Sequence, residues 1–258
     1  MAIVDDASVD IAETPLSPIV ELRQYTLHRG KRDVLIELFD RAFIESQEEL
    51  GMTVIGQFRD MDDPDRFVWL RGFPDMTTRA ESLQAFYGGP IWKANRDAAN
   101  ATMIDSDNVL LLRPAQTGSG FSTDLAHRPS RDATGSGPGR VVAAIYSLEA
   151  GAEGAIAEHF NRHVMPALMD EGGAVLALFV TEPSVNTFPA LPIRENESVF
   201  VWFAGFGNAA ADISLPHDDV PGATGPPQVL RLVPTARSRL SGTSPACHVI
   251  SQQSERHA

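Results

Sequence analysis

Two short stretches of the sequence carry charged and aromatic side chains at alternate positions. Glu21, Arg23 and Tyr25 alternate in the first stretch, and Trp69 and Arg71 alternate in the second. Alternate residues of a β-strand share one face of a sheet, so each set is expected to project together. Arginine binds an enolate, phenolate or carboxylate through a planar set of N–H donors and stays charged at any relevant pH. The pattern therefore favours a pocket for a planar compound that carries oxygen.

Two interpretations of these charges remain open. In the first, Arg23 and Arg71 stabilise an oxyanion, while Tyr25 or a histidine transfers a proton. Glu21 and Trp69 would then contact the ligand. In the second, Glu21 forms a structural salt bridge with Arg23 or Arg71, because paired buried charges need no ligand. The chain would then be a non-catalytic binding or interaction module.

A second candidate site lies in the stretch "EHFNRH", where His159 and His163 are four residues apart. This spacing places both imidazoles on one face of a helix, where they could share a heme or a divalent metal. Acid–base catalysis is the other chemical role open to them. The alternative is a pair of neutral imidazoles that are hydrogen-bonded at a partly buried interface. No HExxH or CxxC motif supports a metal site.

The elements that carry these residues occur twice along the chain. The offset between copies is 121 residues from Tyr25 to Tyr146 and 133 from Phe67 to Phe200. The second copy therefore gains 12 residues between these blocks, in a proline-containing loop around 182–197. It loses 13 residues after its aromatic strand, because the closing strands are offset by 120. The matching stretches are "VELRQYTLHRGKRDVLIELFDR" (20–41) with "VVAAIYSLEAGAEGAIAEHFNR" (141–162), "FVWLRGF" (67–73) with "FVWFAGF" (200–206), and "VLLLRP" (109–114) with "VLRLVP" (229–234).

Comparison of the copies makes two specific predictions. Glu21, Arg23 and Arg71 become Val142, Ala144 and Ala204 in the second copy, whereas the tyrosine and tryptophan are retained. The polar site is therefore expected in the first copy, with a dry and filled counterpart in the second.

The second prediction concerns the orientation of the two histidines. His159 and His163 align with Leu38 and Ala42, two positions on the core-facing stripe of the first copy. Both imidazoles are therefore expected to point under their sheet, near the space left by a shortened second helix.

Each copy is predicted to run strand, helix, strand, strand, helix, strand, which is the order of a ferredoxin-like split βαβ unit. The predicted elements of the first copy are strands near 19–27, after 51, 67–73 and 108–113, and helices near 31–50 and 77–100. Only a short second helix fits in the second copy, within 208–227. Trp92 is expected to pack the start of a helix over the sheet or to line a pocket mouth. A sheet with helices on one face leaves its other face uncovered, so the two sheets are expected to pair within the chain.

The run from "VELRQYTLHRGKRD" through "FVWLRGFPDM" to "FYGGPIWKANRDAANATMIDSDNVLLLRP" resembles the NIPSNAP family over residues 19–114. The second copy resembles a diverged repeat of the same domain. The resemblance implies a dimeric α/β-barrel, a ferredoxin-like superfamily that contains cofactor-independent monooxygenases and several heme proteins. The predicted fold class is thus α+β, with tandem ferredoxin-like repeats that form an intrachain dimeric α/β-barrel. The resemblance implies no uniform reaction, because a shared fold does not establish function.

The predicted organisation follows from the repeat and from composition. The segments are a disordered start (1–18), the first domain (19–114), a Gly-, Ser- and Pro-rich linker (115–139), the diverged domain (140–235) and a disordered polar tail (236–258). Pairing of whole chains into a homodimer is not needed to complete the barrel.

Bulk properties restrict the function classes. The formal net charge of −13 opposes binding to nucleic acid or to an anionic membrane. The start of the chain lacks the apolar core of a signal peptide, and no apolar run approaches the roughly 20 residues of a membrane helix. The single Cys247 excludes a disulfide framework or a thiolate metal cluster. A cytoplasmic location is the expectation.

The function predicted from these residues is a small-molecule enzyme that acts on an aromatic or polyketide-like compound. The reaction would be oxygenation, as in a monooxygenase, or proton transfer, as in a cofactor-independent lyase or isomerase. A heme- or metal-dependent enzyme using His159 and His163 is the first alternative. The non-catalytic module is the second. Apart from that heme or metal, no cofactor is expected, and the partner is a small-molecule substrate.

Overall fold

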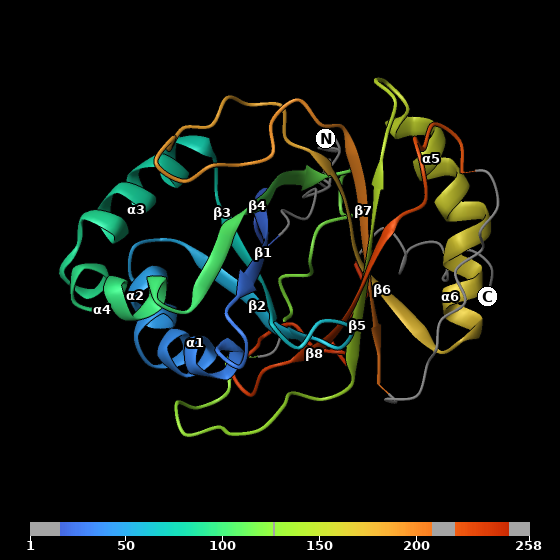
Figure 1. Cartoon of the computed structure of the whole chain (residues 1–258). Helices are drawn as coiled ribbons and strands as arrows, with labels where there is room; N and C mark the ends of the chain where they lie inside the picture. Colours follow the sequence, from blue (N-terminus) through green and yellow to red (C-terminus); the bar gives the residue numbers. More distant parts are fainter. Residues whose placement is uncertain (1–15, 126, 208–219, 248–258) are drawn as a thin grey trace, which may run out of the picture.

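Eight strands close into one barrel in the computed structural model, which describes residues 16–125, 127–207 and 220–247 (Figure 1). The strand order is β1-β3-β2-β8-β5-β7-β6-β4, and the neighbours pair antiparallel. The strands are β1 (Ile19–Leu27), β2 (Thr53–Asp60), β3 (Arg66–Phe73), β4 (Met103–Pro114), β5 (Arg140–Ser147), β6 (Gly173–Thr181), β7 (Val199–Phe206) and β8 (Gln228–Pro234).

Each sequence repeat contributes four neighbouring strands of this barrel. The first repeat supplies β4-β1-β3-β2 and the second supplies β8-β5-β7-β6. Two seams join them, with Phe58 of β2 opposite Pro234 of β8 and Leu112 of β4 opposite Thr181 of β6. The closing strand of each repeat therefore pairs with the second strand of the other. The predicted pseudo-symmetric barrel within one chain is confirmed.

The barrel interior is a packed apolar core. Val20, Leu22 and other inward residues of the strands are fully buried there. The described residues of the segment 115–139 form no regular helix or strand, yet the segment enters this core. Its Phe121 ring lies 5.1 Å from Phe179 and 5.2 Å from Phe203. The interior is consequently filled by side chains, and a ligand site has to be sought elsewhere.

Helices cover the outer faces of the two half-barrels (Figure 1). The predicted helix at 77–100 is interrupted at Gly89, because Pro90 lacks an N–H and starts a new helix. The predicted short helix within 208–227 falls largely on residues 208–219, outside the described residues. The helices are α1 (Arg32–Leu38), η1 (Phe39–Phe43), α2 (Ile44–Glu48), α3 (Met76–Gly88), α4 (Pro90–Asn100), α5 (Glu153–His159), η2 (Phe160–Val164) and α6 (Met165–Asp170).

Both repeats carry a π-helical segment, η1 or η2, at the same place in the first helix. A π turn is wider than an α turn, so residues four apart fall on one stripe. In both repeats this stripe is buried against the sheet. The stripes are Leu35, Phe39, Phe43 and Gln47 in the first repeat, and Ile156, Phe160, Val164 and Leu168 in the second.

The C-terminal segment corrects one prediction. Residues 236–258 were expected to be disordered, but residues 236–247 pack against the barrel. Leu240 donates its N–H to the carbonyl of Ile55 at 2.9 Å, Cys247 donates to that of Val175 at 3.0 Å, and both side chains are buried. Leu240 and Cys247 fill apolar sites on the barrel although most residues next to them in the sequence are polar. The polar composition of the segment therefore does not indicate that it packs against the barrel. Of the predicted N-terminal segment, residues 1–15 lie outside the described part, while Ser17 is buried.

Candidate functional site

Strand pairing brings the predicted polar residues of the first repeat together. Across β1 and β3, Glu21 is opposite Arg71 and Arg23 is opposite Trp69. These side chains, with Tyr25 further along β1, face the helices and not the barrel interior. The alternation of a strand forces this arrangement, because Val20 and Leu22 point inward. The site therefore lies between the sheet and its helical layer.

The Glu21 carboxylate is the centre of a buried ion network. Its Oε2 accepts from Arg71 Nη2 at 2.6 Å, Arg71 Nε at 3.1 Å and Arg23 Nη1 at 2.8 Å. Its Oε1 accepts from Arg79 Nε at 2.8 Å. All four side chains are at most 1% exposed. Both the salt-bridge and the ligand hypotheses are compatible with these contacts.

Two members of this network were not predicted. Arg79 lies on α3 on the same buried stripe as Leu83 and Phe86, and this spacing of three to four residues was the signal that could have identified it. Gln47 accepts from Arg71 Nη1 at 2.9 Å and donates to the carbonyl of Phe43 at 2.8 Å. Its position follows from the π-helical stripe, which the ordinary helical period does not indicate.

The network carries excess positive charge. Arg23, Arg71 and Arg79 surround one carboxylate, and no further ion pair to them occurs within the described residues. Burial alone would raise the pKa of Glu21, but the Arg71, Arg23 and Arg79 charges hold that pKa far below its ordinary value. Burial also lowers the pKa of Arg79, against the opposing effect of Glu21. A surplus of buried charge is costly without a counter-ion, so this region is suited to an anion.

A small aromatic cavity lies next to one end of the network. Its volume of about 30 Å³ is room for one water molecule. Trp92, expected to pack a helix start over the sheet or to line a pocket mouth, lies in the first turn of α4 and lines the cavity. The residues around the cavity are Tyr25, Leu35, Phe39, Phe43, Gln47, Trp69, Phe86, Tyr87, Trp92, Ala99 and Met103.

Two hydrogen-bond donors belong to residues that line this cavity and have no acceptor within the described part of the chain. The Nε1 of Trp69 is buried with no partner. Tyr25 accepts from Arg23 Nε at 3.0 Å, which leaves the hydrogen of the Tyr25 hydroxyl free to donate. Burial raises the pKa of Tyr25, and Arg23 opposes this only in part, so the phenol stays protonated near neutral pH. A ligand oxygen in the cavity could accept from both groups.

The corresponding face of the second repeat is apolar and filled. Val142, Ala144 and Ala204 are buried in one hydrophobic cluster with the rings of Phe160 and Trp202. Leu168 occupies the position that corresponds to Gln47. The counterpart of the ion network is thus a filled apolar cluster, as expected from the comparison of the copies.

The histidine prediction is wrong. His159 is only half-buried and His163 is exposed, with their rings 4.8 Å apart. The π-helical segment shifts the buried stripe to Phe160 and Val164, one residue beyond each histidine. Within the described residues no group of three or more His, Cys, Asp or Glu side chains could hold a metal. The imidazoles at this place are therefore too few for a divalent-metal site, and the exposed His163 is not enclosed as a heme ligand would be.

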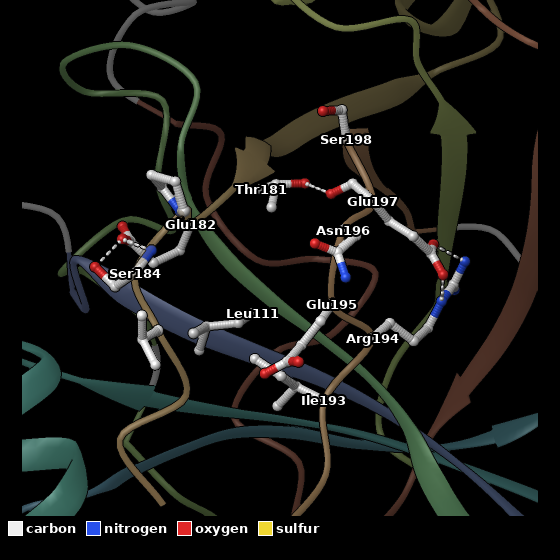
Figure 2. Close-up of a pocket in the computed structure, with 12 residues that line it drawn as sticks. Leu111, Thr181, Glu182, Ser184, Ile193, Arg194, Glu195, Asn196, Glu197 and Ser198 are labelled. Atoms are coloured by element: carbon white, nitrogen blue, oxygen red, sulfur yellow. Dashed lines mark hydrogen bonds and ion pairs between the residues drawn. The ribbon is translucent and has the colours of Figure 1, made fainter. Parts of the chain in front are cut away.

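A larger hollow of about 620 Å³ lies apart from this network. It opens between the two arms of the loop 182–197, over Leu111 of β4 (Figure 2). Four of its polar side chains are engaged in two pairs: Glu182 accepts from Ser184, and Arg194 pairs with Glu197. It has no aromatic lining, so we place the candidate site at the smaller cavity.

Two ferredoxin-like repeats that close one eight-stranded barrel define the protein as a dimeric α/β-barrel contained in a single chain. Residues 20–118 match the model of the NIPSNAP family, so the first repeat is similar to a NIPSNAP domain. This confirms the resemblance noted in the sequence. None of the curated proteins matches the chain.

Several solved structures are similar to parts of the chain. A NIPSNAP-like domain protein from Burkholderia xenovorans is 26% identical, with 37% of this chain and 84% of that chain covered and a TM-score of 0.35. A NIPSNAP family protein from Agrobacterium tumefaciens is 24% identical, with the same coverage and TM-score. A candidate monooxygenase from Lactobacillus acidophilus is 13% identical, with coverage of 86% and 98% and a TM-score of 0.48. The fold assignment itself rests on the strand topology of this chain. None of the helices within the described residues has the length and apolar character that crossing a bilayer requires.

Proposed function

We propose that the first repeat binds a small aromatic or polyketide-like compound through an anionic oxygen, and that Tyr25 transfers a proton at that oxygen. The observation that carries the proposal is the pair of unused donors, Tyr25 O–H and Trp69 Nε1–H, at one aromatic cavity. A buried donor without an acceptor costs roughly 1–3 kcal/mol. A ligand oxygen that accepts from both donors would recover this free energy.

The surroundings of the cavity suit such a ligand. Phenylalanine and tryptophan rings form its walls, which match a planar ring. Donors that are fixed in advance stabilise charge as it develops on an oxygen, which is how an oxyanion hole works. The helical layer has to move outward to admit a ring, because the cavity holds only about one water. The break between α3 and α4 at Gly89 is a place where this layer could bend.

Proton transfer is the reaction that these groups support best. A protonated Tyr25 can donate its proton to an enolate or phenolate oxygen. Arg23 Nε already donates to the Tyr25 oxygen at 3.0 Å, so it stabilises the tyrosinate that remains after the transfer. The Glu21 network holds Arg23 in place for this contact. The proposed class is thus a cofactor-independent isomerase- or lyase-type enzyme.

Binding is tested with 1-naphthol, followed by quenching of tryptophan fluorescence. Tyr25→Phe removes one hydrogen bond and should weaken binding about 10-fold. Tyr146→Phe, the same change in the second repeat, is the matched control and should leave binding unchanged. Naphthalene lacks the oxygen and should bind both variants alike. Equal 1-naphthol affinity in wild type and Tyr25→Phe would overturn the proposed site.

Catalysis is tested with 2-tetralone, whose C1 proton passes to solvent water while the Tyr25 O–H donates to the developing enolate oxygen; the return of a deuteron from solvent to C1 then completes the exchange. The wild-type protein should accelerate this exchange, followed by NMR, and Tyr25→Phe should not. Oxygen uptake is recorded in parallel, because oxygenation of a CH₂ group to C=O consumes dioxygen and releases water. Uptake that requires Tyr25 would replace proton transfer by the monooxygenase-like alternative. Binding without exchange or uptake would favour the non-catalytic module.

A further inference from the structure

The 12-residue insertion of the second repeat lies over the first repeat. The loop 182–197 leaves β6 and reaches α3 (Figure 1). Asn186 Oδ1 and Thr187 Oγ1 both accept from Arg79 Nη1, at 3.0 and 3.1 Å. Phe188 stacks on Tyr87, with ring centroids 5.8 Å apart and planes at 22°. The repeat that lacks the ion network therefore supplies part of the cover over it.

Arg79 is incompletely paired beneath this loop. Only its Nε contacts the Glu21 carboxylate, at 2.8 Å. Its Nη1 has neutral partners on the loop, while its Nη2 is buried and has no partner among residues 16–125, 127–207 and 220–247. The side chain is fully buried, within a network of three arginines and one carboxylate. Two observations, the unpaired donor and the surplus positive charge, thus indicate an anion at the same place.

We propose that Arg79 binds the carboxylate of an aromatic acid beneath the loop 182–197. A carboxylate presents two oxygens in a plane and matches two guanidinium nitrogens. It would displace the Asn186 and Thr187 oxygens from Nη1 and also engage Nη2. The Phe73 ring, 6.0 Å from the Arg79 guanidinium, and the Tyr87–Phe188 pair provide aromatic surfaces nearby. The inference adds a carboxylate to the ligand class of the proposed function, on which it rests.

The attachment of the loop permits the movement that binding requires. Its two arms are fixed to β4, where Glu182 N–H donates to the Leu111 carbonyl at 2.9 Å and Arg194 N–H donates to that of Val109 at 2.8 Å. A hollow of about 620 Å³ lies between these two arms (Figure 2). The central residues can therefore lift from Arg79 while both arms remain attached.

The test measures binding of benzoate and of its neutral isostere benzamide by calorimetry. Benzoate should bind wild type at least about 10-fold more tightly than benzamide, because only the anion pairs with Arg79. Arg79→Met should remove this preference for benzoate. Its fold is expected to persist because Arg23 and Arg71 remain paired with Glu21, and the melting temperature of the variant checks this. The double variant Asn186→Ala/Thr187→Val should bind benzoate more tightly, since no loop oxygen has to be displaced. Ser184→Ala, on the same loop, is the control and should match wild type.

Two results would overturn the inference. One is an unchanged benzoate affinity in folded Arg79→Met. The other is no benzoate binding by the Asn186→Ala/Thr187→Val variant, which is informative even if Arg79→Met does not fold. Measurements with 1-naphthol separate the two proposals. If Arg79→Met loses benzoate binding but binds 1-naphthol normally, the effect is assigned to Arg79. If benzoate binding follows the expected pattern but 1-naphthol binding does not depend on Tyr25, only the proposed Tyr25 site is overturned.

Discussion

Among the residues that the structure describes, Glu21 is the only carboxylate paired with Arg23, Arg71 and Arg79, so its neutralisation should be the most damaging single change in the network. Glu21→Gln keeps the size of the side chain but removes its charge. Arg23, Arg71 and Arg79 would then face an amide, with four hydrogen bonds to the former carboxylate weakened or lost. Breaking a buried ion pair in this way typically costs about 3–5 kcal/mol. We expect a loss of that size in the free energy of unfolding near neutral pH.

The pH dependence of this loss is specific. The pKa of Glu21 is depressed in the folded protein, so its stabilising contribution is complete above the ordinary value of 4.5. As the pH falls below that value, the unfolded chain takes up the proton first, and the contribution declines by about 1.4 kcal/mol per pH unit. At about pH 3, roughly 1.5 units lower, the difference between wild type and Glu21→Gln should therefore shrink by about 2 kcal/mol.

Urea unfolding of both proteins at the two pH values measures these differences. Glu158→Gln is the control, because the Glu158–Arg162 pair is exposed and its loss should cost less than about 1 kcal/mol. The prediction is wrong if Glu21→Gln lowers the free energy of unfolding by less than about 1 kcal/mol. It is also wrong if the difference in free energy of unfolding between wild type and Glu21→Gln is the same at both pH values. Either result would mean that the arginines are hydrated or are neutralised by another group.

Two further predictions concern other parts of the chain. Burial raises the pKa of Asp40 to about 6, although Arg237 and Arg128 oppose the shift. Ionisation of Asp40 therefore destabilises the folded state as the pH rises from about 4 to 6. Asp40→Asn should increase the free energy of unfolding by about 1–2 kcal/mol above that pH range and should leave it unchanged below the range. A decrease in the free energy of unfolding both above and below the range would contradict this prediction. Phe121→Ala should cost about 3–5 kcal/mol in urea unfolding because the ring lies in the barrel core. No change would show that this segment does not stabilise the barrel.

The strand-borne part of the site could be predicted from the sequence. Glu21, Arg23 and Tyr25 share a face because a strand alternates strictly, and the repeat placed Arg71 on the neighbouring strand. The same reasoning gave the paired half-barrels, since each sheet needs a cover for its inner face. These inferences succeeded because they depend on the regular geometry of strands.

The helix-borne and loop-borne parts could not be predicted in the same way. The ordinary helical period placed His159 and His163 inward, but a π turn moved the buried stripe to Phe160 and Val164. Nothing in the local pattern of the insertion indicates that Asn186 pairs with an arginine 107 residues away. Such contacts depend on how the repeats meet in space, which no periodicity within either repeat records.

The covalent connection of the two half-barrels has an evolutionary consequence. In a barrel built from two identical chains, each substitution appears at two symmetry-related places, so a change that improves one site also alters its twin. Fusion of the halves in one chain removes this restriction. An alanine at 204 is compatible with an arginine at 71, and an insertion after β6 need not have a counterpart after β2. A single chain can thus explore asymmetric barrels that are inaccessible to a barrel of two identical chains.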